Sequence, residues 1–439
     1  MPSTVTAAGV ARDQALAALR RVRRGTPVSE AIAAAETMKS ADRALTAQLV
    51  YGVLRHRRYL DAWMRPFQRG RLSPDIRDIL RLALFQMGWL DRVPAYAAVH
   101  AAVEQAKVVQ PRAAGLVNAV LRRAQSRPPD PDHLSLGERF SHPDWLVERW
   151  RARYGPRLVS ILEADNRVPP LMLRVNLSRT TRNAVLEELA NLGVAAEPSA
   201  YLPEAVRVQG SLWLEDLPAF RRGLATVQDE SGMLVGWILD PKPGDRIIDM
   251  AAGVGGKALH VLERTDGAVR LTGLDVSKPR LALFSENLKR TGYHDRVELA
   301  HSAAEGYAAQ HRSTYDRIIL DAPCSGLGVL RRRVDGRWSK APDDLRALSA
   351  RQQELLRAAA ELAKPSGGVI VYSTCSAEPE ETIEVLERVG PDRLGLVRED
   401  VTPFLPHAAL RDFVTDGMLT LAPGDLGMDG FFIARLRKD

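Results

Sequence analysis

Residues 246–260 of this 439-residue chain read RIIDMAAGVGGKALH. A short apolar run leads into a turn that contains Gly253, Gly255 and Gly256, and a helical pattern follows from about Lys257. Small residues at such a turn allow backbone amides to approach a ligand at the C-terminal edge of a parallel sheet. The stretch therefore predicts a cofactor pocket between a strand and the helix that follows it.

Apolar runs alternate with helical patterns from about residue 244 onward. These runs are RIIDM (246–250), VRLTGLDV (269–276), RVELA (296–300), DRIILDAP (316–323) and GGVIVYSTC (367–375). Buried strands separated by helices predict an α/β fold with a mostly parallel, doubly wound, Rossmann-like sheet. Asp275 ends the second run, 22 residues after Gly253, where a carboxylate can accept hydrogen bonds from ribose hydroxyls. This arrangement suits NAD and S-adenosylmethionine alike, so the pattern leaves that choice open.

The N-terminal part of the chain has a different pattern. Residues 5–125 place apolar side chains at three- and four-residue spacing, which predicts helices throughout. The proline-rich stretch SRPPDPDH (126–133) then indicates a domain boundary. We expect a helical domain over 1–130, a small α+β connecting region over 131–230 and the α/β catalytic domain over 231–439.

Charge is divided unequally along the chain. Residues 1–140 carry 22 Lys and Arg against 12 Asp and Glu, whereas the remaining residues carry 39 against 42. A positive field confined to one end is typical of a module that binds a polyanion such as RNA or DNA. Three arginine clusters lie there: Arg20, Arg21, Arg23 and Arg24; Arg55, Arg57 and Arg58; and Arg122 and Arg123. We expect these clusters to contribute to a nucleic-acid surface, although solvated helix ends are the simpler interpretation.

Composition narrows the class of protein further. Hydrophobic residues make up 45% of the chain and charged residues 26%, which excludes a largely disordered or fibrous protein. No uncharged apolar run approaches the roughly 18–20 residues that a membrane span needs. The first residues also lack the basic start of a signal peptide. We therefore expect a soluble, cytoplasmic protein that does not associate with a membrane.

The chain has two cysteines, Cys324 and Cys375, and each directly follows a predicted strand. Two cysteines exclude a disulfide scaffold and a four-thiolate zinc site, and His301 and His311 are too isolated to complete a metal site. An open α/β sheet places its active site at the C-terminal ends of its parallel strands. Both thiols are therefore expected in the active site, and no metal is expected there.

A thiol beside an S-adenosylmethionine pocket suits the methylation of cytosine. Carbon 5 of cytosine is a poor nucleophile, but addition of a thiolate to carbon 6 enables carbon 5 to take a methyl group from a sulfonium. An acidic group near ring nitrogen 3 and the exocyclic amine would stabilise the adduct, and Asp321 is placed for this role. The target base must also leave its stack to reach the pocket. The residues alone do not decide which cysteine attacks and which assists release.

The motifs around the two cysteines resemble those of a known family. DAPCSG (321–326) and STCSAEPEE (373–381) are similar to the motifs of the RNA 5-methylcytosine methyltransferases of the Nop/Sun type. The resemblance covers roughly residues 140–439 and includes ATVQDESG (225–232) and GFFIARL (430–436). It implies a class I methyltransferase domain with S-adenosylmethionine as the methyl donor. It also implies that Cys375 is the nucleophile and that Cys324 serves product release.

The glycine turn and the resemblance together assign a set of residues to the cofactor. These residues are Ala251, Ala252, Gly253, Val254, Gly255, Gly256, Lys257, Asp275, Arg280, Ser302 and Asp321. The family loop usually reads CAAPGGK, whereas here Ala251 replaces the cysteine and Val254 replaces the proline. Loss of the proline makes the loop less preorganised, so we expect weaker cofactor binding. Ser302 stands where the family commonly has an aspartate after the third strand, and a serine can still hydrogen-bond an amine.

The helical N-terminal region resembles the RNA-binding fold of NusB, with AQLVYGVLRHRRYLD (47–61) and GLVNAVLRR (115–123) as the similar stretches. A NusB-like domain joined to this catalytic domain is typical of family members that methylate a cytidine in 16S rRNA. The resemblance therefore implies 16S rRNA, free or in a small-subunit assembly intermediate, as the partner, and monomer is the default oligomeric state. Arg331, Arg332, Arg333 and Trp338 are candidates to hold the RNA strand by phosphate contact and stacking.

Three alternatives stay open at this point. The first is a tRNA cytosine-5 methyltransferase, which would use the same chemistry on another RNA. The second is a non-catalytic RNA-binding ribosome-assembly protein with a degenerate cofactor loop, which the altered AAGVGGK sequence favours and the two cysteines oppose. The third is a DNA methyltransferase, which the lack of a sizeable target-recognition insert opposes.

Overall fold

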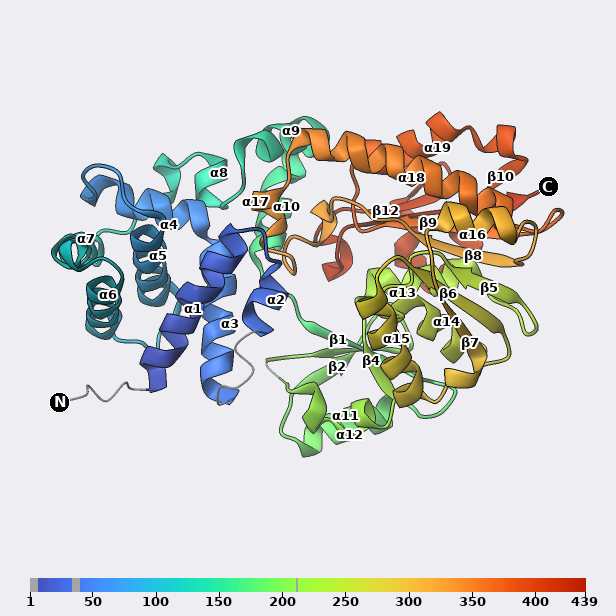
Figure 1. Ribbon diagram of the computed structural model, residues 1–439, viewed down its shortest axis with the longest axis horizontal. Helices are drawn as coiled ribbons and strands as arrows, with labels where there is room; N and C mark the ends of the chain where they lie inside the picture. The colour runs from blue at the N-terminus through green and yellow to red at the C-terminus, as the bar shows by residue number, and fades with distance from the viewer. Residues whose placement is uncertain (1–6, 34–39, 211) are drawn as a thin grey trace. The chain divides into compact units, whose positions relative to one another are not determined.

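The computed structural model describes residues 7–33, 40–210 and 212–439 and is drawn in Figure 1. The chain forms two compact units, Met1–Arg167 with Leu330–Lys340, and Val168–Val329 with Ala341–Asp439. The region expected to connect two domains, residues 131–230, is thus divided between the units. Within the described ranges, no helix is long and apolar enough to cross a membrane.

The first unit is helical, and the prediction of helices over residues 5–125 is confirmed for the part that the structure describes. Its helices are α1 (Ala7–Arg23), α2 (Val28–Ala33), α3 (Ser40–Arg55), α4 (Arg57–Met64), α5 (Pro74–Trp89), α6 (Ala95–Val109), α7 (Ala114–Ala124), α8 (Leu136–Arg139), α9 (Asp144–Tyr154), α10 (Leu158–Asn166) and α17 (Gly336–Ser339). Helix α5 begins where Ser73 accepts a hydrogen bond from the Ile76 amide and Pro74 supplies a fixed φ. Ile76, Ile79 and Leu80 are buried in the core of the unit.

The segment Leu330–Lys340 belongs to this helical unit although it follows the Cys324 motif in sequence. The Arg337 side chain is fully buried and donates to the Asn166 side chain at 2.8 Å. The indole of Trp338 donates to the Leu54 carbonyl at 2.8 Å, and Arg331 is 6% exposed. Arg331 is thus packed inside the protein and Trp338 is half-buried with its indole N–H engaged, which disfavours both as RNA contacts.

Two of the three arginine clusters are also partly used inside the helical unit. Arg20 pairs with Asp75 at 2.8 Å, and Arg58 pairs with Asp144 at 2.6 Å. The Arg55 guanidinium is buried. These ion pairs and this burial reduce the number of arginines that can meet phosphate, because each engaged guanidinium would have to break its internal contacts first.

The second unit begins with a small antiparallel sheet in the order β2-β3-β1-β4. Its strands are β1 (Leu171–Val175), β2 (Ala196–Pro198), β3 (Ala205–Val208) and β4 (Ala225–Val227), with helices α11 (Arg182–Asn191) and α12 (Pro218–Arg221). Alternate apolar residues of β1 and β3 pack against Val185 and Leu189 of α11. These strands thus bury one face against α11, and Ala219 of α12 joins the same cluster.

The large sheet has the order β11-β12-β13-β9-β8-β5-β6-β7, and β10 pairs with β13. Its strands are β5 (Arg246–Asp249), β6 (Arg270–Asp275), β7 (Val297–His301), β8 (Arg317–Asp321), β9 (Val369–Thr374), β10 (Leu396–Glu399), β11 (Val414–Thr415), β12 (Met418–Leu421) and β13 (Phe431–Lys438). Strands β5 to β9 are parallel, and β10 to β13 join antiparallel. The predicted α/β fold with a mostly parallel core sheet is confirmed.

Helices cover both faces of the large sheet (Figure 1). Helices α13 (Glu230–Leu239), α14 (Gly256–Arg264) and α15 (Lys278–Thr291) share one apolar cluster with Ile247, Ile319 and Val371. Helices α16 (Ala304–Gln310), α18 (Pro342–Leu362) and α19 (Ile383–Val389) share the cluster on the other face. The strand order reverses between β5 and β8, and ligands bind in the crevice at such a reversal.

Candidate active site

The loop after β5 has the backbone shape that its glycines predict. Gly253 and Gly255 have φ of +56° and +88°, in the left-handed region. A Cβ on Gly255 would lie 2.1 Å from ring atoms of Phe284, so this position requires glycine. The side chain of Asn287 donates to the Val254 carbonyl at 3.1 Å. This contact supports the loop at the residue that replaces the family's proline.

Asp275, at the end of β6, connects the glycine loop to the next helix. One carboxylate oxygen accepts from the Gly253 amide at 2.9 Å, and the other accepts from the Ser277 amide at 2.8 Å. Each carboxylate oxygen has a second lone pair, which is available to a ribose hydroxyl. The loop backbone and this carboxylate therefore fit a nucleoside cofactor at the crevice.

The other residues assigned to the cofactor lie near this edge with different exposure. Ser302 follows β7, is half-buried and donates its hydroxyl to the Ala303 carbonyl at 3.1 Å. Arg280 is exposed in the first turn of α15. Asp275 ends β6 and pairs with His301 at the end of β7, so Asp275 and Ser302 lie at the ends of neighbouring strands.

Lys257 and Asp321 form an ion pair across the crevice, with Nζ and Oδ2 2.6 Å apart. Ser373 donates to the other oxygen of Asp321 at 3.0 Å. Burial on its own lowers the pKa of Lys257, but Asp321 outweighs it and the pKa is raised, so the ammonium stays charged. The ammonium also lies 5.6 Å from the centre of the Phe431 ring. Lys257, which the sequence assigned to the cofactor alone, is thus bound to the predicted acid.

Asp249 lies at the end of β5 and is 1% exposed. Burial raises the pKa of its carboxyl to about 7, with Lys257 opposing the shift and Asp321 adding to it. The electrostatic effect of both residues shows that Asp249 lies near the ion pair. Asp249 accepts from the Ala251 amide at 3.4 Å, as a turn residue does, but its burial beside these charges distinguishes it from an ordinary capping residue.

The two cysteine side chains meet at the ends of β8 and β9. Their Sγ atoms are 3.2 Å apart. The hydrogen bond with Cys375 and burial raise the pKa of the Cys324 thiol, and the negative charges of Glu381 and Asp321 add to the shift. Either sulfur can be the donor in this contact, so one thiol can stabilise a thiolate that forms on the other.

Sequence reasoning missed Glu381, which supports the loop that carries Cys324. Its carboxylate is fully buried and accepts from the Ser325 amide at 2.7 Å and the Ser325 hydroxyl at 2.5 Å. Gln352 donates to the same carboxylate at 3.3 Å and to the Pro323 carbonyl at 2.9 Å. Burial raises the pKa of Glu381, although its hydrogen bonds act in the opposite direction. The only sequence signal was its place in the SAEPEE stretch, which gives no role.

The backbone beneath the cysteines is closely packed. The Gly328 amide donates to the Cys375 carbonyl at 3.0 Å, and the Gly430 amide donates to the Gly328 carbonyl at 2.8 Å. A Cβ on Gly328 would lie 2.2 Å from the Gly430 carbonyl oxygen, so glycine is required. The family-like stretch 430–436 thus forms β13 beside the strand of Cys375.

Together, the reversed strand order, the glycine loop and the acid after the second strand define a class I methyltransferase. Within the described ranges, no group of three or more His, Cys, Asp or Glu side chains could hold a metal ion. A family model for the 16S rRNA methyltransferase RsmB/F matches residues 236–437. The NusB family matches residues 10–126, and an RsmF/B-like ferredoxin-like domain matches residues 142–214.

Known proteins resemble the chain over nearly its whole length. The probable ribosomal RNA small subunit methyltransferase B of Bacillus subtilis is 34% identical, covering 97% of this chain and 98% of the relative. The corresponding protein of Synechocystis is 37% identical over 90% and 91%. The crystal structure of PH0851 has a TM-score of 0.82 at 23% identity and covers 99% of both chains, which shows the shared fold.

The chain therefore belongs to the RsmB/F family of RNA methyltransferases. It is an RNA cytosine-5 methyltransferase that uses S-adenosylmethionine, and RNA is its substrate. Family membership thus decides the choice between NAD and S-adenosylmethionine. It also makes the non-catalytic and DNA-methylating alternatives wrong.

Proposed function

We propose that this enzyme methylates carbon 5 of a cytidine in 16S rRNA through a covalent adduct with Cys375. The observation that carries the proposal is the pair of thiols 3.2 Å apart, at the strand ends next to the Lys257–Asp321 ion pair. Curated relatives of this chain are ribosomal RNA small subunit methyltransferases, which supports 16S rRNA as the substrate. A tRNA cytidine is the alternative substrate for the same chemistry.

The ion pair complements the edge of a cytosine ring. Ring nitrogen 3 of cytosine accepts a hydrogen bond and the exocyclic amine donates one. The Lys257 ammonium is a donor and the Asp321 carboxylate is an acceptor, and the two are 2.6 Å apart. In the proposed adduct, Cys375 Sγ bonds to carbon 6 while negative charge develops toward nitrogen 3. Lys257 would stabilise that charge by donating to nitrogen 3, and Asp321 would hold the ring by accepting from the exocyclic amine.

When bound, S-adenosylmethionine would supply the methyl group that carbon 5 takes and would become the neutral thioether. Release would then require transfer of the carbon-5 proton to water, with its bonding pair forming the carbon 5–carbon 6 double bond. The bond between Sγ and carbon 6 breaks, and its electron pair returns to Cys375. The Cys324 thiol, whose pKa is raised, can donate a hydrogen bond to the departing thiolate. Cys324 is thus proposed to assist release rather than attack.

The helical unit is proposed to bind the RNA. Arg122 and Arg123 are exposed at the end of α7, unlike the buried Arg55. A groove of about 820 Å³ between α6 and α7 is lined by Tyr96, His100, Lys107 and Arg122, among others. Cations and an aromatic ring suit phosphate contact and base stacking. We also propose that the enzyme acts as a cytoplasmic monomer on free 16S rRNA or an assembly intermediate.

Transfer of tritium from labelled S-adenosylmethionine tests the substrate. We expect label in 5-methylcytidine of unmodified 16S rRNA and none in unmodified tRNA. Label in tRNA alone would overturn the 16S assignment, and label at another atom of the base would overturn the cytosine chemistry.

Charge reversal tests the RNA surface. The Arg122→Glu/Arg123→Glu variant should bind 16S rRNA roughly tenfold more weakly, with the slope of log affinity against log salt reduced by about 2. Its affinity for S-adenosylmethionine should not change. The control is a charge reversal outside α6 and α7, for which Lys340→Glu serves. Arg58→Glu is unsuitable because it would also break the ion pair with Asp144. Equal losses in both variants would place RNA elsewhere.

A further inference from the structure

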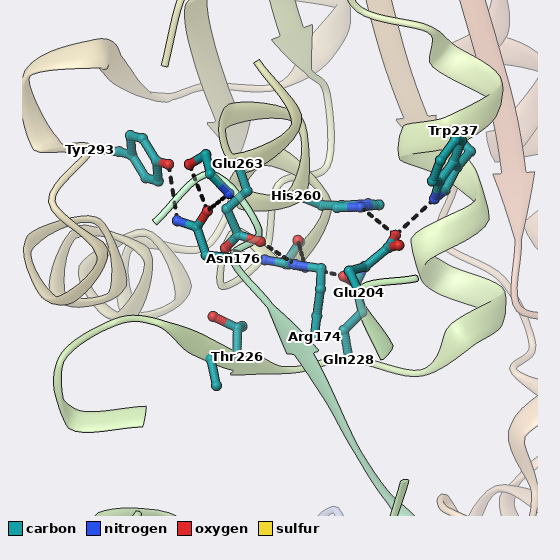
Figure 2. A network of polar contacts seen from close by, with 12 residues as sticks. Arg174, Asn176, Glu204, Thr226, Gln228, Trp237, His260, Glu263 and Tyr293 are labelled. Atoms are coloured by element: carbon teal, nitrogen blue, oxygen red, sulfur yellow. Dashed lines mark hydrogen bonds and ion pairs between the residues drawn. The ribbon is translucent and has the colours of Figure 1, made fainter. Parts of the chain in front are cut away.

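A buried arginine of the small sheet contacts the helix that begins at the cofactor loop. Arg174 lies in β1 and is 0% exposed (Figure 2). Its Nε and Nη2 donate to the two carboxylate oxygens of Glu263 at 2.6 and 2.9 Å. Its Nη1 donates to the Gly256 carbonyl at 2.8 Å and also contacts the Gln228 side chain. One guanidinium therefore holds the first and last turns of α14.

A second residue preceding the small sheet's β3 contacts the middle of the same helix. Glu204 accepts from His260 Nε2 at 3.0 Å and from the Trp237 indole at 2.8 Å (Figure 2). Burial acts to raise the pKa of Glu204, but these hydrogen bonds outweigh it and lower the pKa to about 2. Burial lowers the pKa of His260. The Glu204 carboxylate is thus held by the imidazole on α14 and by the indole on α13.

The contacted residues of α14 lie on one face of the helix. Gly256, His260 and Glu263 are spaced by four and three residues, which is the spacing of a single helical stripe. Gly256 begins α14 and is also the last glycine of the cofactor loop. The position of the loop's end therefore depends on residues that lie up to 82 positions earlier in the chain.

Stability alone does not account for this arrangement. A buried ion pair loses its hydration, and apolar side chains of similar volume often stabilise a fold as well or better. The pair does, however, fix geometry, because a bidentate guanidinium sets direction as well as distance. Such a restraint matters at this loop, where two residues have positive φ and the proline is absent.

We propose that Arg174 is a positioning residue for the cofactor loop, so that the small sheet sets the affinity for S-adenosylmethionine. The proposal rests on the proposed methyl transfer and on the cofactor binding at this loop, as the sequence predicts and the contacts of Asp275 support. Without the Arg174 contact, the Gly256 carbonyl and the loop before it would have more freedom to lose on binding. The affinity for the cofactor would then fall, while turnover with saturating cofactor would change little.

The test replaces the whole ion pair so that no charge is left buried. Arg174→Met/Glu263→Met removes the contact to Gly256 and leaves apolar side chains of similar size. The matched control is Arg435→Met/Glu399→Met, because Arg435 is also a buried arginine that pairs with a glutamate at 2.7 Å. Arg435 donates to the Ile238 and Leu239 carbonyls of α13 instead of the cofactor loop.

Titration calorimetry with S-adenosylmethionine should give about tenfold weaker binding for the Arg174 double variant, as expected for one lost hydrogen bond with a charged donor. The control variant should bind within twofold of the wild type. Affinity for 16S rRNA should be unchanged in both, and kcat at saturating cofactor should stay within twofold while KM for the cofactor rises. If the double variant does not fold, Arg174→Lys replaces it in the test. The lysine keeps a positive charge beside Glu263 but lacks the bidentate guanidinium, so we expect an intermediate loss of cofactor affinity.

Unchanged cofactor affinity in the folded Arg174 double variant, or an equal loss in the control, would overturn the positioning role. Asp275→Ala separates this failure from a failure of the proposed site. If Asp275→Ala also binds the cofactor as tightly as the wild type, the cofactor does not lie at this loop, and both proposals fail. If only Asp275→Ala binds weakly, the site stands and the role of Arg174 does not.

Discussion

The cofactor loop and the cysteine loops lie at the same edge of the sheet, but they are held differently. Side chains from β1, β6 and α15 hold the cofactor loop through its backbone groups. The loop with Cys324 is held by a carboxylate, Glu381, which follows Cys375 by six residues. A change inside the glycine motif can therefore be compensated by side chains from elsewhere in the fold. The loop with Cys324, in contrast, is held by Glu381, which belongs to the motif of the other cysteine.

Among substitutions of residues that support the two regions, the largest effect is expected at Glu381. Glu381→Ala leaves the Ser325 amide and hydroxyl without their acceptor in a buried site. We expect methyl transfer to fall by roughly 100-fold, as the cost of such unpaired groups implies, with cofactor affinity within twofold. Single-turnover kinetics and calorimetry measure the two quantities. Ser325→Ala, which removes one of the two bonds, should lose less, and an equal loss of cofactor affinity in Glu381→Ala would break the comparison.

The next effect concerns the backbone of the cofactor loop. Gly255→Ala places a Cβ against Phe284 at φ +88° and should destabilise the protein by about 2–4 kcal/mol while weakening cofactor binding. Gly253→Ala is the matched variant, because its nearest neighbour is the Ala251 carbonyl at 4.0 Å. It should cost only about 1–2 kcal/mol, from backbone strain alone. Thermal and urea unfolding would show the order, and equal destabilisation would contradict the role of Phe284.

A smaller effect is expected at Asp249, which lies between the two regions. Its pKa of about 7 in the folded state is above its value in an unfolded chain, so the folded protein binds more protons between about pH 4 and pH 7. Stability should therefore fall as pH rises through this window, by a few kcal/mol at most. Asp249→Asn should flatten that slope in urea titrations. A slope unchanged by the substitution would show that another group produces it.

Local patterns were enough to predict the sheet, the glycine loop and the position of both cysteines. Strands β5, β6, β8 and β9 are mostly buried apolar runs, and Asp275, Cys324 and Cys375 lie at or just after the ends of three of them. The roles of Glu381 and Arg174 could not be predicted, because their hydrogen-bond partners lie 56 and 82 residues away in sequence. Charge composition was a weaker guide, since Arg55 and Arg337 are buried inside the helical unit instead of facing a polyanion.

The most direct test of the account is the covalent adduct between enzyme and RNA. Cys324→Ala should accumulate a protein–16S rRNA complex that survives denaturing electrophoresis when S-adenosylmethionine is present. Cys375→Ala and the double variant should form none, and Cys375→Ala should lose methyl transfer by on the order of a thousandfold or more. A stable complex with Cys375→Ala and none with Cys324→Ala would contradict the assignment of the two thiols.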